Sequence, residues 1–243
     1  MTKNLYAMDK GKSFFQIPEK SWNEKGRDRM KQKVLSILLC TSMILAVTPA
    51  VYGAETVKAA EETNTAAAEI TTMPFTDVPY YFADAALWAY SAGIANGTSA
   101  TTFSPTMSCS RGQMVTFLWK LAGAPAVEGE MPFWDVPENV YYYDAVLWAA
   151  QEGIAGGTGP DIFSPDATCS RGQMVTFLWN MAGRPEVDME NPFIDISPED
   201  DCYEAALWAV QEGITAGTST ITFGPQDLCQ RWQVITFLYQ MEQ

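Results

Sequence analysis

The sequence predicts an all-α fold in which three helix-loop-helix repeats close into a pseudo-threefold bundle. An eleven-residue phrase recurs at a spacing of sixty residues, at 109–119, 169–179 and 229–239. Two helices in fewer than sixty residues cannot bury their own apolar faces, so the repeats must share one core. An open solenoid needs polar end caps. Here the first and last repeats keep the Phe, Trp and Leu residues of the middle one, which favours closure.

The recurring phrase predicts the start of the second helix in each repeat. Ser110 and Ser170 are good N-cap residues, because a hydroxyl accepts from a free backbone N–H of the first turn. Gln113 and Gln173 follow three residues later and complete a capping box. The apolar residues that follow recur at helical spacing on one face, at Met114, Phe117, Leu118 and Leu121. Glycines then end the helix, at Gly123 and Gly183.

The first helix of each repeat is predicted around a recurring Leu-Trp-Ala. Its tryptophans are interpreted as core residues: Trp88, Trp148 and Trp208. In repeat one the helical spacing predicts a buried stripe through Tyr81, Ala85, Trp88 and Ala89. A Phe-x-Asp-Val/Ile segment precedes each of these helices and supplies three equivalent acids, assigned a capping or structural role: Asp77, Asp135 and Asp195.

An arginine lies in the first turn of all three second helices, at Arg111, Arg171 and Arg231. A cation there opposes the helix dipole and needs a compensating anion. Residues 74–243 hold only five Lys or Arg, and three of them occupy this one position. One hypothesis is that the guanidinium and exposed N–H groups bind a ligand carboxylate or phosphate. The alternative is internal pairing with Asp77, Asp135, Asp195 or another acid, and both roles could coexist.

Two further sets of equivalent residues are candidates for ligand contact. Glycines in the loop between the helices either let a ligand approach the backbone or serve a turn that needs positive φ: Gly97, Gly157 and Gly217. Aromatic residues outside the main stripe of the second helix either stack on sugar faces or pack between repeats: Trp119, Trp179 and Tyr239.

Composition narrows the classes of function. Residues 1–33 hold nine Lys or Arg against four Asp or Glu, and the remaining 210 residues hold six against twenty-five. A body this acidic lacks the basic footprint of a nucleic-acid-binding protein. The chain has no histidine, and no phosphate-binding loop, nucleophile motif or C-x-x-C metal spacing occurs. We therefore expect no enzyme activity, no cofactor and no metal.

The N-terminal region 1–54 is interpreted as a signal peptide. Basic residues precede an apolar run from Val34 to Val47, and small residues follow it. The run is too short for a membrane span. The compact signal that begins at Met30 is the expected true start. A lipid anchor on Cys40 is disfavoured, because the bulky Leu39 precedes it. Residues 55–72 are an Ala-, Glu- and Thr-rich spacer.

Four cysteines follow the predicted signal region. Three are equivalent and are expected to be small buried residues: Cys109, Cys169 and Cys229. The alternative to four free cysteines is a disulfide that involves the fourth one, Cys202.

The repeats, at 73–126, 131–186 and 191–243, resemble the S-layer homology (SLH) domain. The resemblance rests on F-x-D-V/I, A-x-x-W-A, G-I and F-x-P, three times in register, each followed by a helix that opens with S-R-x-Q in the first two repeats and Q-R-x-Q in the third. It implies an all-helical spindle with grooves between neighbouring repeats. It also implies that the arginines Arg111, Arg171 and Arg231 take part in binding a secondary cell-wall polymer, often pyruvylated. Gln113, Gln173 and Gln233 replace the family's Glu, and repeat three reads Gln230-Arg231-Trp232.

The function implied by the resemblance is non-covalent anchoring to the bacterial cell wall by a secreted, monomeric module. The partner is then a wall glycopolymer, without nucleic acid and without a membrane span after cleavage of the signal. The alternative is a structural envelope protein that self-associates or binds other surface proteins.

Overall fold

The structure is a computed structural model and describes residues 72–243. The predicted signal region and residues 55–71 of the predicted spacer lie outside the described residues. A 3-10 turn, η1, precedes the first of six α-helices: η1 Tyr80–Phe82, α2 Ala83–Ser91, α3 Arg111–Leu121, α4 Tyr143–Gln151, α5 Arg171–Met181, α6 Tyr203–Gln211 and α7 Arg231–Met241. No strand occurs within 72–243, where β-pairing is limited to isolated bridges. The all-α prediction is confirmed.

Helices α3 and α5 begin where their capping residues predict. The Ser110 hydroxyl accepts from the backbone N–H of Gln113, and the Gln113 side chain accepts from the backbone N–H of Ser110. Ser170 and Gln173 form the same box on α5. The predicted glycine stops are also found, because Gly123 and Gly183 adopt a φ of 84° directly after the C-cap residues.

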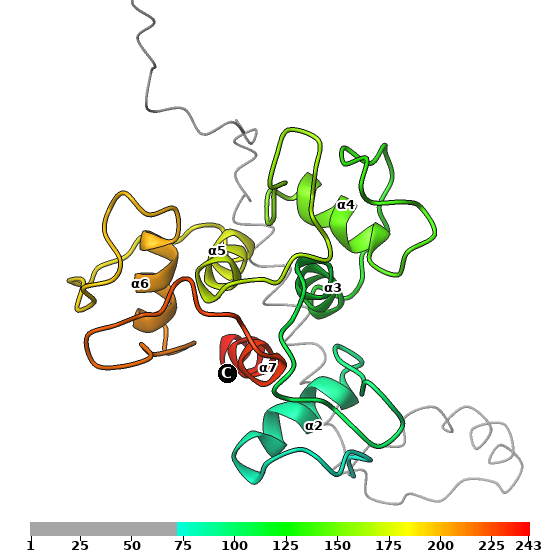
Figure 1. The fold of residues 1–243 in the computed structure, drawn as a ribbon, viewed down its shortest axis with the longest axis horizontal. Helices are drawn as coiled ribbons and strands as arrows, with labels where there is room; N and C mark the ends of the chain where they lie inside the picture. Colours follow the sequence, from blue (N-terminus) through cyan, green and yellow to red (C-terminus); the bar gives the residue numbers. More distant parts are fainter. Residues whose placement is uncertain (1–71) are drawn as a thin grey trace, which may run out of the picture.

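The six helices form an inner and an outer set. Figure 1 shows α3, α5 and α7 end-on around the centre, with α2, α4 and α6 outside them. The most extensive contacts join α3 to α4, α5 to α6, and α7 to α2. Each inner helix therefore packs on the outer helix of the next repeat, and the last repeat packs on the first. The closed pseudo-threefold bundle stays a prediction.

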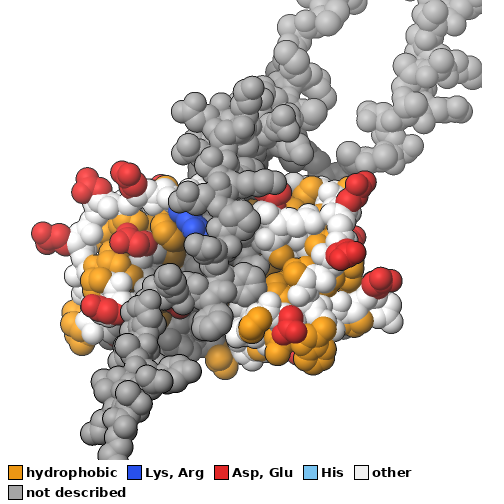
Figure 2. Space-filling view, turned by 90° about the horizontal axis from the view of Figure 1, so that it is seen from above, with side chains coloured by type: hydrophobic (Ala, Val, Ile, Leu, Met, Phe, Trp, Pro, Cys, Tyr) orange, Lys and Arg blue, Asp and Glu red, His pale blue; other side chains and the backbone are white. Residues whose placement is uncertain are grey.

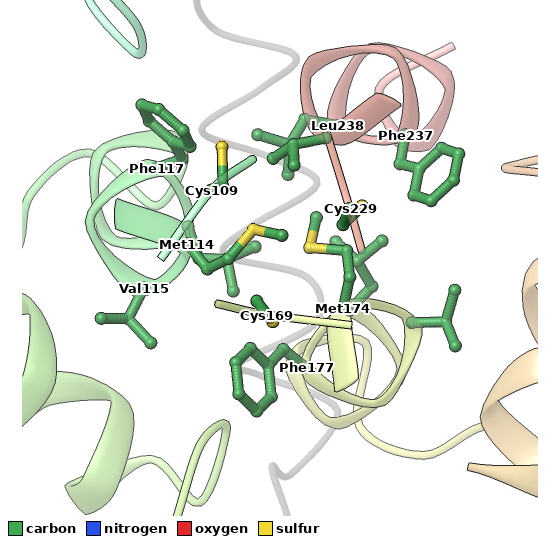
Figure 3. Packing of buried hydrophobic residues seen from close by; sticks show 14 of the residues in the cluster. Cys109, Met114, Val115, Phe117, Cys169, Met174, Phe177, Cys229, Phe237 and Leu238 are labelled. Atoms are coloured by element: carbon green, nitrogen blue, oxygen red, sulfur yellow. The ribbon is translucent and has the colours of Figure 1, made fainter. Parts of the chain in front are cut away.

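Three cysteines tie the repeats together at the centre (Figure 3). The backbone N–H of Cys109 donates to the carbonyl of Cys229, Cys169 donates to Cys109, and Cys229 donates to Cys169, at 2.9–3.0 Å. All three side chains are fully buried and carry free thiols. The prediction of small buried residues is confirmed, and Cys202 forms no disulfide with any described cysteine. A larger side chain at these positions would meet a close-packed interior.

The core continues outward along the inner helices. Met114 and Met174 point into the centre beside the cysteines (Figure 3), and both are fully buried. Of the predicted core tryptophans, Trp148 and Trp208 are buried and Trp88 is partly buried against the core. The predicted stripe in repeat one is wrong at its first residue. Tyr81 lies in the 3-10 turn η1, ahead of α2, and its side chain is 66% exposed.

Candidate functional site

Each arginine at the head of an inner helix reaches into the loop of the next repeat. Arg111 Nε donates to the carbonyl of Phe163 at 3.0 Å, and its Nη2 donates to the carbonyl of Gly156 at 2.7 Å. The guanidinium lies 4.7 Å from the Phe163 ring centroid, within cation–π range. The Arg111 side chain is only 3% exposed. One guanidinium therefore holds the loop of another repeat by two carbonyls and a ring.

The other two arginines repeat this arrangement. Arg171 donates to the carbonyls of Phe223 and Ala216, and Arg231 donates to those of Phe103 and Asn96. Both side chains are 4% exposed. The contacts run from repeat one to two, from two to three, and from three to one. We call the three contact regions the α3–α4, α5–α6 and α7–α2 junctions.

The expectation of exposed N–H groups at these helix N-termini is wrong. The backbone N–H of Arg111 donates to the carbonyl of Ala167, and that of Gly112 donates to the carbonyl of Pro165. The Ser110 cap takes the N–H of Gln113. The first turns of α5 and α7 bond in the same way to repeats three and one. Turns of the neighbouring repeat thus satisfy the N–H groups that would otherwise receive an anion.

The equivalent acids do not form ion pairs with the arginines either. Asp135 accepts from the backbone N–H groups of Phe163 and Ser164, at 2.8 and 2.7 Å. Asp77 and Asp195 accept in the same way from the next Phe and the residue after it. Within residues 72–243 no carboxylate forms an ion pair with Arg111, Arg171 or Arg231. The aspartates fix the loop within their own repeat, and the arginine then holds that loop from outside.

The buried guanidinium groups carry charge without a paired anion. Burial lowers the pKa of all three, while nearby groups such as Asp135 beside Arg111 oppose the shift. An arginine side chain has five N–H donors. The hydrogen bonds of Arg111 and Arg231 use two each, so three donors of each have no acceptor within the described residues. Buried donors without an acceptor are uncommon in folded proteins.

The loop glycines are required for a reason other than positive φ. Gly97, Gly157 and Gly217 do not adopt a left-handed φ, so that interpretation is wrong. A Cβ on Gly97 would overlap the Phe75 ring and the carbonyl oxygens of Ser99 and Thr102. The left-handed residues of this region come later in the chain, at Ser104, Ser164 and Gly224. The glycines let the loop fold tightly over an aromatic ring of their own repeat.

The second set of aromatic residues packs against the chain. Trp119 and Trp179 donate their indole N–H to the carbonyls of Pro125 and Pro185, each at 2.9 Å. Tyr239 takes the equivalent position and lies 5.5 Å from the Trp88 ring. All three are partly buried against the core. Sugar stacking by Trp119 or Trp179 stays a prediction.

Sequence reasoning did not recognise as a set the aromatic residues that lie beside the arginine-bearing turns. Tyr81 lies 6.2 Å from Trp232, edge to face, at the α7–α2 junction. Tyr141 and Tyr142 lie 4.9 Å apart at the α3–α4 junction. Two adjacent tyrosines occur just before the first helix of both repeat one and repeat two. That pattern could have identified them.

The comparisons with known proteins agree with the repeats. The model of the S-layer homology domain matches residues 74–115, 132–175 and 192–234. The chain belongs to the S-layer homology family. Each SLH match ends within an inner helix and includes its arginine. This confirms the resemblance identified from the repeated motifs.

Three relatives of the SLH chain are larger proteins. It is 28% identical over 199 residues to an endoglucanase of Bacillus sp. (strain KSM-635), covering 75% of the chain and 20% of that protein. It is 31% identical over 126 residues to a cell surface protein of Thermoanaerobacter kivui, covering 48% and 16%. It is 27% identical over 104 residues to the surface-layer 125 kDa protein of Lysinibacillus sphaericus, covering 43% and 9%. The chain thus spans about a fifth or less of their lengths.

Family and relatives together indicate a surface-anchoring module of the bacterial cell surface. Within 72–243, none of the SLH helices has both the length and the hydropathy needed to cross a membrane. The same part of the chain contains no cluster of His, Cys, Asp or Glu side chains arranged to hold a metal ion.

Proposed function

We propose that this module is secreted, has no catalytic activity, and holds non-covalently to the cell wall by binding an anionic secondary polymer, such as a pyruvylated one. The inter-repeat grooves headed by Arg111, Arg171 and Arg231 are the proposed contacts. This proposal rests on the guanidinium groups at the junctions, where N–H donors have no acceptor within the described residues. An oxygen-rich anion would supply acceptors to those donors and would offset the charge.

The acidity of the rest of the surface favours the same sites. Figure 2 shows Asp and Glu side chains on both sides of the viewed face, where it is not covered by grey atoms. An anionic polymer is repelled by such a surface except where a cation is locally dominant. Three of the five cations in residues 74–243 are at the junctions. Binding should weaken only modestly as salt rises, because salt screens the charge of a buried side chain much less than that of an exposed one.

The decisive experiment is co-sedimentation of the full chain with purified wall sacculi of the encoding bacterium. Sacculi are compared before and after hydrofluoric acid removes secondary polymers. We expect the chain to sediment with intact sacculi and to stay in solution with stripped ones. Equal retention on both would point to peptidoglycan or to nonspecific adhesion and would contradict the proposal.

Arginine variants need a control for lost stability, because these side chains also hold the fold. Arg171→Lys keeps the charge and loses the fork of donors. Val175→Ala lies one turn away on the same helix, is fully buried, and serves as a matched destabilised variant. We expect Arg171→Lys to reduce retention on intact sacculi and Val175→Ala to leave it unchanged, both being assayed below their unfolding temperatures.

A second candidate, an envelope protein that binds other surface proteins or itself, is favoured by exposed apolar residues in repeat three. Ile194 is 78% exposed and Ile221 is 53% exposed, and the backbone N–H of Ile194 donates to the Ile221 carbonyl. Two adjacent exposed isoleucines form an apolar patch that a protein partner can cover. Light scattering after size exclusion separates the candidates, since a monomer fits the anchor and a concentration-dependent oligomer fits the assembling protein.

A further inference from the structure

Each of the three junctions has a turn that carries an arginine, but the junctions differ in the aromatic residues beside that turn. At the α3–α4 junction Tyr141 is 64% exposed and packs edge-on against Tyr142. At the α7–α2 junction the equivalent Tyr81 is 66% exposed and packs edge-on against Trp232. At the α5–α6 junction the positions of Tyr141 and Tyr142 are held by Asp201 and Cys202. Two junctions therefore carry an aromatic pair with one exposed and one partly buried member, and the third junction has no such pair.

These rings lie next to the arginine-bearing turn. The Tyr142 ring lies 3.2 Å from where a Cβ on Gly112 would be, and Gly112 directly follows Arg111. Trp232 directly follows Arg231, and its indole N–H donates to the side-chain oxygen of Gln230 at 2.7 Å. At the α5–α6 junction the Cys202 sulfur takes the place of the Tyr142 ring and lies 3.0 Å from where a Cβ on Gly172 would be. The aromatic pairs thus lie beside the turns that carry the arginines, and the guanidinium whose charge acts on the Tyr141 hydroxyl is that of Arg231, at the neighbouring α7–α2 junction.

The chemistry of the rings selects one class of occupant. A tyrosine or tryptophan ring has an apolar face and a polar edge. A pyranose ring matches both, with C–H groups on its face and hydroxyls at its rim. A cation beside such rings, on an otherwise acidic surface, favours a sugar chain that carries an anionic group.

We infer that the Tyr141–Tyr142 and Tyr81–Trp232 pairs stack on pyranose rings of the wall polymer, so that two junctions bind it tightly and the α5–α6 junction binds it weakly. The inference rests on the proposed function and adds the sugar contacts and the inequality of the three sites. At the α7–α2 junction Trp232 adds an aromatic contact that the other two junctions lack at this position, because their equivalent residues are Gly112 and Gly172.

The loss experiment removes the most exposed member of each pair. The full chain carrying Tyr81→Ser and Tyr141→Ser is titrated against intact and hydrofluoric-acid-stripped sacculi, with Trp134→Ala as the matched control. Trp134 is also an exposed aromatic residue, at 72%, and its backbone N–H bonds to Asp161 in the outer loop of repeat two. We expect the double variant to bind intact sacculi about tenfold more weakly. Trp134→Ala should bind like the wild type.

The gain experiment supplies the missing pair. Asp201→Tyr with Cys202→Tyr gives the α5–α6 junction the residues of Tyr141 and Tyr142. Thermal unfolding confirms that the variant is folded before titration. We expect tighter retention on intact sacculi and an increased binding capacity, because a third site becomes equivalent to the other two.

The outcomes separate this inference from the function on which it rests. If the wild type binds intact and stripped sacculi equally well, both the proposed function and the sugar contacts are contradicted. Polymer-dependent wild-type binding that the double serine variant retains within about twofold overturns the inference alone. A folded gain variant with wild-type affinity and capacity overturns the claim that the α5–α6 junction is weak for lack of aromatic rings.

Discussion

Arg231 Nη2 donates to the carbonyl oxygen of Asn96, 2.9 Å away in space and 135 residues earlier in the chain. Its Nε donates to the Phe103 carbonyl, 128 residues earlier. The matching Nη2 bonds of Arg111 and Arg171 span 45 residues each. The same local contact therefore closes a far longer loop at the α7–α2 junction.

Replacing Arg231 by alanine should lower the free energy of unfolding by about 3 kcal/mol. The change removes two hydrogen bonds to a charged group and leaves two carbonyls in a part-buried site unpaired. Urea unfolding followed by circular dichroism measures this. Lys120→Gln, in the last turn of α3, is the control and should cost less than about 1 kcal/mol. A loss below about 1 kcal/mol for Arg231→Ala would show that the closing contact is dispensable.

Acid should weaken the fold through the loop aspartates. Burial raises the pKa of Asp77, but the N–H donors of Phe103 and Ser104 outweigh it, and the pKa is lowered overall. The pKa of Asp195 is lowered in the same way. A carboxyl with a lowered folded-state pKa stabilises the fold above about pH 4. That contribution is lost as pH falls through the folded-state pKa.

The pH test compares Asp77→Asn with the wild type. The variant should melt at a lower temperature at pH 7, because an amide offers one oxygen to two N–H donors. The difference should shrink as the pH is lowered below about 4, where the wild-type carboxyl becomes protonated. Glu130→Gln, at an exposed acid, controls for the change in net charge. A difference that stays constant with pH would contradict the role of the Asp77 charge.

Alanine substitutions at loop glycines should have different effects on stability, depending on whether the added methyl group meets other atoms. Gly97→Ala places a Cβ against the Phe75 ring and two carbonyl oxygens, so we expect a loss of about 2 kcal/mol or more in unfolding free energy. Gly156→Ala meets nothing within 4 Å and should change stability by less than about 1 kcal/mol. Chemical denaturation of both variants provides the measurement. Equal effects would mean that the loop can rearrange around Gly97.

The thiols should differ sharply in reactivity. Burial raises the pKa of Cys109 and Cys169 to about 12, against the opposing effect of the nearby arginines, and also raises that of Cys229. Burial raises the pKa of the Cys202 thiol too, but this side chain is only partly buried and is therefore accessible to a reagent. Iodoacetamide should therefore alkylate Cys202 in the native protein and the other three only after unfolding. Tandem mass spectrometry of tryptic peptides reads each site, including Cys202 and Cys229, which have no Lys or Arg between them and share one peptide. Comparable native labelling of Cys169 would contradict the closed centre.

The local features of the fold could be read from the sequence because their causes are local. The Ser110–Gln113 box and the Gly123 stop involve neighbours within one turn, and both are found as predicted. The buried cysteines followed from the repeat alone, since equivalent positions without partners at metal or disulfide spacing favour packing. Such features need no knowledge of how the repeats meet.

The partners of Arg111 could not be predicted, because they belong to another repeat. The sequence placed the guanidinium at a helix head and offered an anion or an aspartate as its neighbour. The actual acceptors are the carbonyls of Gly156 and Phe163, 45 and 52 residues away. Every residue has a backbone carbonyl, so residue identities do not show which carbonyl accepts a hydrogen bond. Gly97 has a related difficulty, since glycine identity alone does not distinguish positive φ from a close contact.

The bond between Arg231 and Asn96 also orders events during synthesis. Repeats one and two can meet through Arg111 as soon as residue 163 is available, but the first loop has no arginine to hold it until residue 231 exists. The mutual bonds of the three cysteines likewise stay incomplete until Cys229 has been made. The loop of repeat one therefore cannot complete its contacts until α7 has been synthesised, and a nascent chain of two repeats lacks the arginine that holds this loop.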